Sequence, residues 1–398
     1  MKHLTALLLA VLLLILPVLA CAESVSTEAS AQQETPAQEN APVRKEKNAP
    51  LKLLKELYTQ QNMLVFSPVS LSVALSMAAE GADGETLSQL DAFLGRKPDT
   101  MFIEDMRFSG VQLADIALVR PGFELLGTYE QALSRKYDAS VASMDPESVM
   151  MQVNDWVSDH TQGLIEELLT EEPDPNTMLL LINALSMKAD WVHPFPAAAT
   201  GFGLFHAPQG DIEVSSMHQT ASLSYSCVDG VQTVSLPYRN SPLEMLVLLP
   251  EDGNLDALIE ALCASPDEFI ARHEPQEEKM VRLSLPNVYA ESSFELKDAL
   301  MAMGVINAFD PDLADFSAMA ANAPEYDLYI GSVLQKAVLH VNETGTEAAA
   351  ATQVAVLTRG AFAPQEIIEM NVDRPFMMLV YDRFSGYVLF AACINNPA

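Results

Sequence analysis

A continuous apolar run, "TMLLLINALSMKADW" at residues 177–191, places the strongest constraint on the fold of this 398-residue chain. Such a run indicates a strand buried on both faces at the centre of a sheet. Before it, apolar residues at helical spacing predict several helices, including one that begins at Ser67 and Pro68. After it, strand patterns dominate, and the last of them predicts a hairpin around Ser385 and Gly386. Because helices come first and do not alternate regularly with strands, the sequence predicts an α+β fold.

Residues 1–22 have the pattern of an export signal, in which Lys2 precedes the apolar stretch 4–20. Two kinds of processing fit this end of the chain. The small residues around Cys21 suit ordinary signal cleavage, whereas "VLAC" resembles a lipobox that would make Cys21 a lipidated N-terminus. Residues 23–47 contain mostly Ser, Thr, Glu, Gln, Ala and Pro, so we expect a disordered spacer. Both alternatives predict an extracellular protein, either secreted or lipid-anchored on the outer face of the cell membrane.

The formal net charge is −32, and such a surface repels nucleic acid and heparin-like polyanions. The sequence contains no H-E-x-x-H, G-x-S-x-G, Walker or dinucleotide-binding motif, so we expect no enzyme and no cofactor. The spacing of Cys227, Cys263 and Cys393 fits no metal site, and we expect these residues to be buried free thiols, with one disulfide as the alternative.

A segment near the C-terminus, "HVNETGTEAAAATQVAVLTRGAFAPQ" at 340–365, has conflicting preferences. Its four consecutive alanines favour a helix, whereas the β-branched residues that follow them favour a strand. Arg359 is the only lysine or arginine between Glu343 and Asp373. If the segment is extended, alternate residues from Thr346 onward form an uncharged face: Thr346, Ala348, Ala350, Thr352, Val354 and Val356.

The chain resembles the serpin family from about residue 48 to its end, so we expect a serpin domain at 48–398. The resemblance rests on these stretches, which occur in the family's order: "FSPVSLSVALSMAAEGADGET", "VNDWVSDHTQGLIEELL", "LLLINALSMKADW", "LSLPNVYAESSFELKDALMAMGV", "DLADFSAM", "LQKAVLHVNETGTEAAAAT" and "RPFMMLVYDRFSGYVLFAACINNP". The resemblance implies helices packed on a large mixed main sheet, smaller further sheets and an exposed reactive loop. Together with the export signal, it identifies an exported bacterial member of the family.

Serpins are suicide inhibitors. A serine protease cleaves the reactive loop, and the loop then enters the main sheet as a new strand while the acyl-enzyme is trapped. The resemblance places this loop at about 343–372, with an extended part after Gly360. The hinge that enters the sheet first would comprise Glu343, Gly345, Thr346, Glu347, Ala348, Ala349, Ala350, Ala351 and Thr352. Its small, uncharged inward face suits insertion, because a buried charge there would cost several kcal/mol.

In the family the cleaved bond lies at a nearly fixed distance from the hinge glutamate. Counted from Glu343 as the first residue, the seventeenth is Arg359. We therefore expect cleavage between Arg359 and Gly360 by a trypsin-like serine protease, whose specificity pocket binds arginine through a carboxylate. Cleavage one or two bonds earlier would instead indicate a chymotrypsin-like or elastase-like target. We expect a monomer that forms a covalent acyl complex, and the alternative is a non-inhibitory surface or carrier protein with this fold.

Several positions depart from the family pattern. Gln335 stands where the family usually has a histidine, in the region where the sheet opens. The other members of that region would be Ser67, Ser70 and Asn183. Asn287 replaces a lysine that often pairs with the hinge glutamate, so we expect no ion pair and a looser top of the sheet. The stretch 95–112 leaves little room for the helix that binds glycosaminoglycans in some members.

Overall fold

The computed structural model describes residues 45–59, 62–145, 147–346 and 366–398. The chain from Lys45 to Ala398 forms one compact unit. The expected export signal, its candidate lipidation site Cys21 and most of the expected spacer lie outside the described residues. Among the described helices, none is both long and apolar enough to cross a membrane.

Nine α-helices and four 3-10 helices are described within these ranges. The α-helices are α1 (Leu54–Leu57), α2 (Pro68–Gly81), α3 (Gly84–Leu94), α4 (Thr100–Phe108), α5 (Gly127–Tyr137), α6 (Val149–His160), α7 (Leu255–Ala264), α8 (Pro266–His273) and α9 (Lys297–Ala302). The 3-10 helices are η1 (Ala49–Leu53), η2 (Ala197–Ala199), η3 (Asn307–Phe309) and η4 (Ala323–Glu325). Helix α2 begins as the sequence predicts, because the Ser67 side chain accepts a hydrogen bond from Ser70 N and Pro68 occupies the first turn.

Seven described strands form the main sheet. They are β2 (Val111–Val119), β3 (Ser140–Ser143), β4 (Leu179–Met187), β5 (Ala189–Asp190), β11 (Val288–Glu295), β12 (Ile330–Val341) and β13 (Gly345–Thr346). The predicted central strand is β4, and every one of its residues is buried. It pairs in parallel with β12 and antiparallel with β2, so the sheet is mixed. The apolar run at 177–191 thus correctly located the middle of the sheet.

Nine strands form a second sheet that is not smaller than the main one. They are β1 (Met63–Phe66), β6 (Gly201–Ala207), β7 (Gly210–Val228), β8 (Val231–Pro237), β9 (Leu243–Pro250), β10 (Glu278–Pro286), β14 (Ile367–Asn371), β15 (Phe376–Asp382) and β16 (Val388–Ile394). Strand β7 has 19 residues and pairs with β6, β8 and β10, which joins two ladders into one sheet. Strands β15 and β16 form the hairpin predicted around Ser385 and Gly386.

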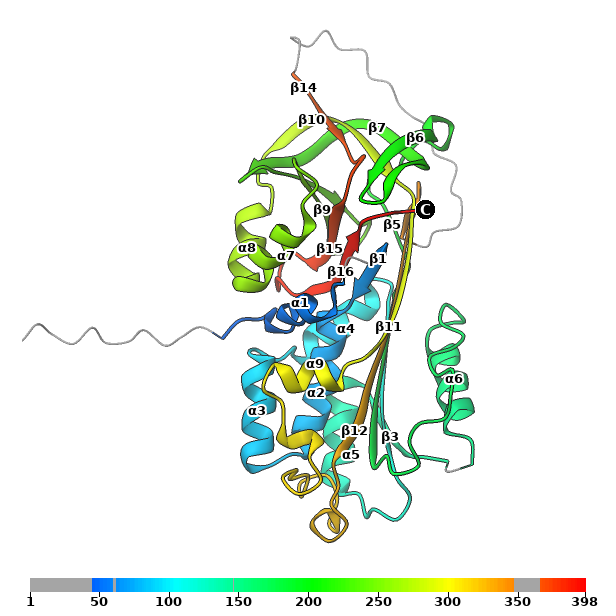
Figure 1. Cartoon of the computed structure of the whole chain (residues 1–398), viewed down its shortest axis with the longest axis vertical. Coiled ribbons are helices and arrows are strands. Elements are labelled where there is room, and N and C mark those ends of the chain that lie inside the picture. The colour runs from blue at the N-terminus through cyan, green and yellow to red at the C-terminus, as the bar shows by residue number, and fades with distance from the viewer. Residues whose placement is uncertain (1–44, 60–61, 146, 347–365) are drawn as a thin grey trace, which may run out of the picture. The chain divides into compact units, whose positions relative to one another are not determined.

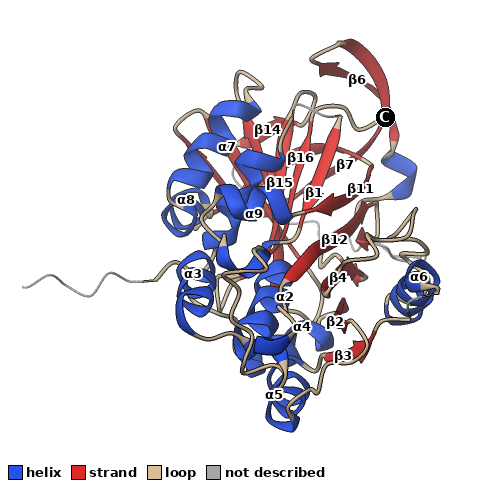
Figure 2. Ribbon diagram, turned by 60° about the horizontal axis from the view of Figure 1, so that its bottom comes forward, coloured by secondary structure: helices blue, strands red, loops and turns tan. Residues whose placement is uncertain are grey.

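The two faces of the main sheet are covered unequally (Figures 1 and 2). Helix α6 lies on one face, where Val149, Val153 and Val157 pack into a small apolar cluster with residues of β2, β4 and β12. The main core lies on the other face, where α2 contacts β2, β4 and β16. This second helix is almost wholly buried because its neighbours surround it.

Two segments differ from the sequence-based expectation. The stretch 95–112 holds a nine-residue helix, α4, capped by the Asp99 side chain, so the expectation of little room for a helix was wrong. Its charged residues are Glu104, Asp105 and Arg107, which do not make a basic surface. The expected loop at 343–372 also includes β14, which pairs in parallel with β10.

Candidate functional site

The start of the expected hinge already forms part of the main sheet. Gly345 and Thr346 make the short strand β13, which pairs with β12 through Val341 and with β5 through Ala189 and Asp190. The turn before it is closed by the Asn342 side chain, whose oxygen accepts hydrogen bonds from the backbone N of Thr344 at 2.9 Å and of Gly345 at 3.2 Å. The chain therefore leaves β12, reverses direction and enters the space beside it.

Thr346 is fully buried at this position, with 0% of its surface exposed. Its hydroxyl shares a 2.7 Å hydrogen bond with the Tyr238 hydroxyl. Burial raises the pKa of Tyr238, so the phenol stays neutral. The Trp191 ring stacks on Tyr238 with 4.4 Å between centroids, and its Nε1 donates to the Asn342 carbonyl at 3.0 Å. This aromatic pair supports the underside of β13.

Gly345 fits because it has no side chain. A Cβ atom there would lie 2.0 Å from the carbonyl oxygen of Ala189, a backbone atom of the neighbouring strand. No side chain can relieve that contact by rotating, so β13 can occupy its place only with glycine at 345.

Glu343 lies just before β13 and is held by hydrogen bonds. Thr200 Oγ1 donates to its carboxylate at 2.7 Å, and the Asn287 side chain also hydrogen-bonds to it. Burial pushes the pKa of Glu343 upward, but these hydrogen bonds outweigh it and the pKa is lowered. Phe195 N donates to its carbonyl at 2.8 Å. Uncharged side chains, those of Thr200 and Asn287, therefore hydrogen-bond to Glu343 at the top of the sheet. Asn287 takes the place of the lysine whose ion pair with this glutamate was expected to be missing.

The structure brings together the residues expected to control sheet opening. Gln335 on β12 donates from Nε2 to Asn183 Oδ1 on β4 at 2.7 Å, and the two residues lie opposite each other in register. Gln335 also binds the backbone of Ser67, accepting from its N at 3.0 Å and donating to its O at 2.9 Å. We call Ser67, Asn183 and Gln335 the gate. Ser70 donates its backbone N to Ser67 Oγ, but its own hydroxyl does not join the gate.

Asp115 on β2 also belongs to this network, although it was not among the residues predicted from the sequence. Asn183 Nδ2 donates to its carboxylate at 2.5 Å, which extends the gate by one strand. The signal was an acidic residue within the apolar pattern "QLADIALV". Such a residue is expensive to bury unless it has a partner, and its partner lies on another strand.

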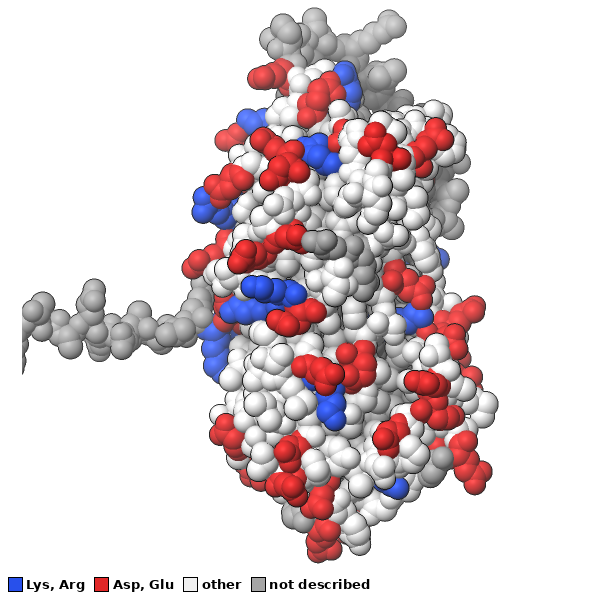
Figure 3. Space-filling model, in the orientation of Figure 1, with Lys and Arg blue, Asp and Glu red and all other residues white. Residues whose placement is uncertain are grey.

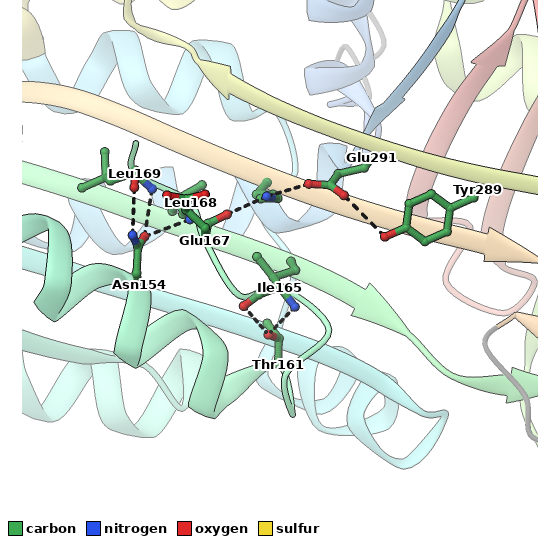
Figure 4. Close-up of polar contacts among 9 residues, drawn as sticks. Asn154, Thr161, Ile165, Glu167, Leu168, Leu169, Tyr289 and Glu291 are labelled. Atoms are coloured by element: carbon green, nitrogen blue, oxygen red, sulfur yellow. Dashed lines mark hydrogen bonds and ion pairs between the residues drawn. The ribbon is translucent and has the colours of Figure 1, made fainter. Parts of the chain in front are cut away.

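On the opposite face of the same strands, hydrogen bonds hold the segment that follows α6, and an ion pair joins β12 to β11 (Figure 4). Lys336 Nζ forms an ion pair with Glu291 on β11 at 2.6 Å and donates to the Glu167 carbonyl at 2.5 Å. The Asn154 side chain binds the backbone of Leu168 and Leu169, with its oxygen 2.9 Å from both amide nitrogens. The segment after α6 therefore lies over β12, and a strand entering beside β12 must displace or pass beneath it.

The expected cleavage bond and most of the hinge lie outside the described residues. These are Glu347, Ala348, Ala349, Ala350, Ala351, Thr352, Arg359 and Gly360. Cys227, Cys263 and Cys393 are free thiols, but only Cys263 and Cys393 are buried, so the expectation of a buried thiol was wrong for Cys227. Burial raises the pKa of Cys263 to about 11. Across the described ranges, no cluster of histidine, cysteine and carboxylate side chains is suited to hold a metal ion.

These features define a class of α+β protein with two distinguishing properties. Residues that follow β12 return to the main sheet as the short strand β13, and buried side chains of Asn183 and Gln335 join β4 to β12. The sequence profile of the family described as Serpin (serine protease inhibitor) matches residues 45–397. An uncharacterized serpin-like protein of Thermococcus kodakarensis is 32% identical over 366 residues, which cover 87% of this chain and 83% of that protein. Serpin-Z2B of Triticum aestivum is 34% identical and covers 84% of this chain and 90% of its own. The chain belongs to the serpin family.

Solved structures agree with this assignment. The native stressed conformation of Arabidopsis AtSerpin1 matches with a TM-score of 0.78 at 27% identity, covering 88% of this chain and 96% of that one. The native thermophilic serpin tengpin matches with a TM-score of 0.77 at 25% identity, covering 88% of this chain and 92% of its own. Thyroxine-binding globulin in complex with thyroxine shares the fold at 22% identity, with a TM-score of 0.75 and coverage of 88% and 99%. Serpins are generally inhibitors of serine proteases and not catalysts.

Proposed function

We propose that this protein is a single-use inhibitor of trypsin-like serine proteases, cleaved between Arg359 and Gly360. The acyl-enzyme would be trapped when the cleaved loop enters the main sheet beside β12. The observation that carries this proposal is β13, because two hinge residues already pair with β12 and β5 as a strand.

The register of β13 supports further insertion. Thr346 lies opposite Val341, so each further pair of inserted residues would lie opposite a residue two positions earlier on β12. Ala348 would lie opposite Leu339, and Thr352 would reach Gln335. Small side chains at these positions would enter a core-facing row without overpacking it.

The target follows from the sequence of the loop. Arg359 stands seventeenth from Glu343 and is the only basic residue of the loop, which favours proteases that bind arginine. Acidic side chains are spread over the face of the molecule shown in Figure 3, in keeping with a net charge of −32. That surface favours basic partners and disfavours nucleic acid and heparin.

We further propose that the protein is exported. Either Cys21 carries a lipid that tethers the protein to the membrane, or the mature protein is freely secreted. Mass spectrometry of the mature N-terminus distinguishes the two.

Incubation with trypsin tests the inhibitor proposal. The expected product is a complex that survives SDS and has the summed mass of trypsin and the inhibitor up to Arg359, because the fragment that begins at Gly360 is the leaving group and is held by no covalent bond. Arg359→Ala is expected to remove this complex, because the specificity pocket loses its charged ligand, and catalytically inactive trypsin should also give none. Cleavage after Arg359 without any complex would refute inhibition and identify a non-inhibitory serpin. A complex that persists with Arg359→Ala would place the cleaved bond elsewhere.

A further inference from the structure

Asp115 accepts the last hydrogen bond of a chain of three that run in one direction. Ser67 N donates to Gln335, Gln335 Nε2 donates to Asn183, and Asn183 Nδ2 donates to the Asp115 carboxylate. The chain joins the start of α2 to strands β12, β4 and β2. These three hydrogen bonds end on one carboxylate, and hydrogen bonds in such a chain strengthen one another.

The bond that must break for the sheet to open is the middle one. Gln335 and Asn183 connect β12 to β4, and a strand that continues β13 downward must separate them. Asp115 and Asn183 lie opposite each other on β2 and β4, and a strand that enters between β4 and β12 does not pass between that pair. Opening therefore removes the Gln335 donor from Asn183 and leaves the hydrogen bond between Asn183 and Asp115 in place.

The surroundings of Asp115 allow its charge to change. Only 5% of its surface is exposed, and it lines a cavity of about 520 Å³ at the edge of β2. Burial raises the pKa of Asp115 to about 7, although the Asn183 hydrogen bond and the Arg107 guanidinium lower it. Arg107 on α4 forms an ion pair with Asp138, which follows α5. The other charged or titratable groups nearby are Glu104, which interacts with Arg107, and His160 of α6, which lines the cavity.

We propose that Asp115 is a positioning residue of the gate: its carboxylate holds Asn183 and Gln335 together, and its protonated form releases them. A carboxylate accepts a stronger hydrogen bond than a neutral carboxyl group does, so the closed gate favours the ionised form. The Asp115 carboxylate must then have a higher proton affinity when the gate is open than when it is closed. Acidification through neutral pH therefore favours the open gate. The proposal rests on the inhibitory function only for its effect on protease trapping.

Hydrogen–deuterium exchange of the whole protein tests this inference without a protease. We expect the protection factors of backbone amides in β4 and β12, corrected for intrinsic exchange, to fall about threefold to tenfold between about pH 8 and about pH 6. Asp115→Asn keeps the shape and an acceptor for Asn183 but cannot titrate in this range. Its protection factors are expected to be the same at both pH values.

His160→Gln is the matched control, because His160 lines the same cavity and its replacement leaves the Asp115 carboxylate in place. It should retain the pH dependence of the wild-type protein. The inference is overturned if the wild-type protection factors do not change with pH, if they rise on acidification, or if His160→Gln abolishes the change. Failure to trap trypsin would leave these exchange results unaffected, so the two proposals are tested separately.

Discussion

If the protein inhibits trypsin as proposed, Thr346→Arg is expected to convert it from an inhibitor into a substrate. Thr346 is fully buried between β12 and β5, and its hydroxyl binds Tyr238 at 2.7 Å. No described carboxylate binds this hydroxyl, so an arginine placed there would bring a charge without a partner into the core. The strand β13 would leave the sheet to avoid that burial.

The magnitude follows from two contributions. Leaving a buried charge without a partner costs about 3–5 kcal/mol. Losing the hydrogen bond to Tyr238 adds about 1 kcal/mol. The total, about 4–6 kcal/mol, shifts the equilibrium between inserted and expelled β13 by about a thousandfold or more. Thr346→Val is the matched control, since it loses only the hydrogen bond and should shift the equilibrium about fivefold.

Two measurements check this prediction. The number of inhibitor molecules consumed per trypsin molecule inhibited should rise steeply for Thr346→Arg and only slightly for Thr346→Val. The fluorescence of Trp191 should also change in the uncleaved arginine variant, because Trp191 stacks on Tyr238 beneath β13. If the stoichiometry of inhibition equals that of the wild-type protein, trapping does not require residue 346 to be buried in the sheet and the reasoning is refuted.

Two further predictions concern Gly345 and Asp115. Gly345→Ala should likewise yield a substrate, because its Cβ would lie 2.0 Å from the Ala189 carbonyl oxygen; an unchanged yield of SDS-resistant complex would contradict this. Asp115→Asn should stabilise the fold at about pH 8. The folded-state pKa of Asp115, about 7, exceeds its ordinary value, so the wild-type protein loses stability as pH rises from about 4 to about 7. Thermal unfolding should show a benefit of up to about 4 kcal/mol above neutral pH that disappears near pH 4; equal benefits at both would exclude Asp115 as the cause.

The sequence was sufficient to predict the elements whose signals are local and strong. The run at 177–191 became β4 and β5, and Ser67 with Pro68 marked the start of α2. Helix α4 was missed because it is short and buries only Phe102, Ile103 and Met106. Its only clear signal was Asp99, a capping residue in a stretch with many polar residues.

The candidate site was less predictable because distant residues complete it. Gln335, Asn183 and Ser67 were expected to meet, and the structure shows how they meet. Asp115 could not be added from the sequence, because its partner Asn183 lies 68 positions away. Strand β13 has only two residues, so no periodic pattern can reveal it. Its position depends on contacts with β12, β5 and Tyr238, which only the folded chain provides.

The short strand β13 also bears on how quickly a longer strand can form. The first residues of any new strand lose conformational freedom before enough hydrogen bonds exist to compensate, and this unfavourable nucleation step limits the rate. In this protein the folded chain has already ordered Gly345 and Thr346 against both neighbouring strands. Growth of the strand is therefore reduced to propagation, one residue at a time from an existing end. In the proposed mechanism, two features oppose this growth: β4 must separate from β12, and the segment after α6 lies over β12.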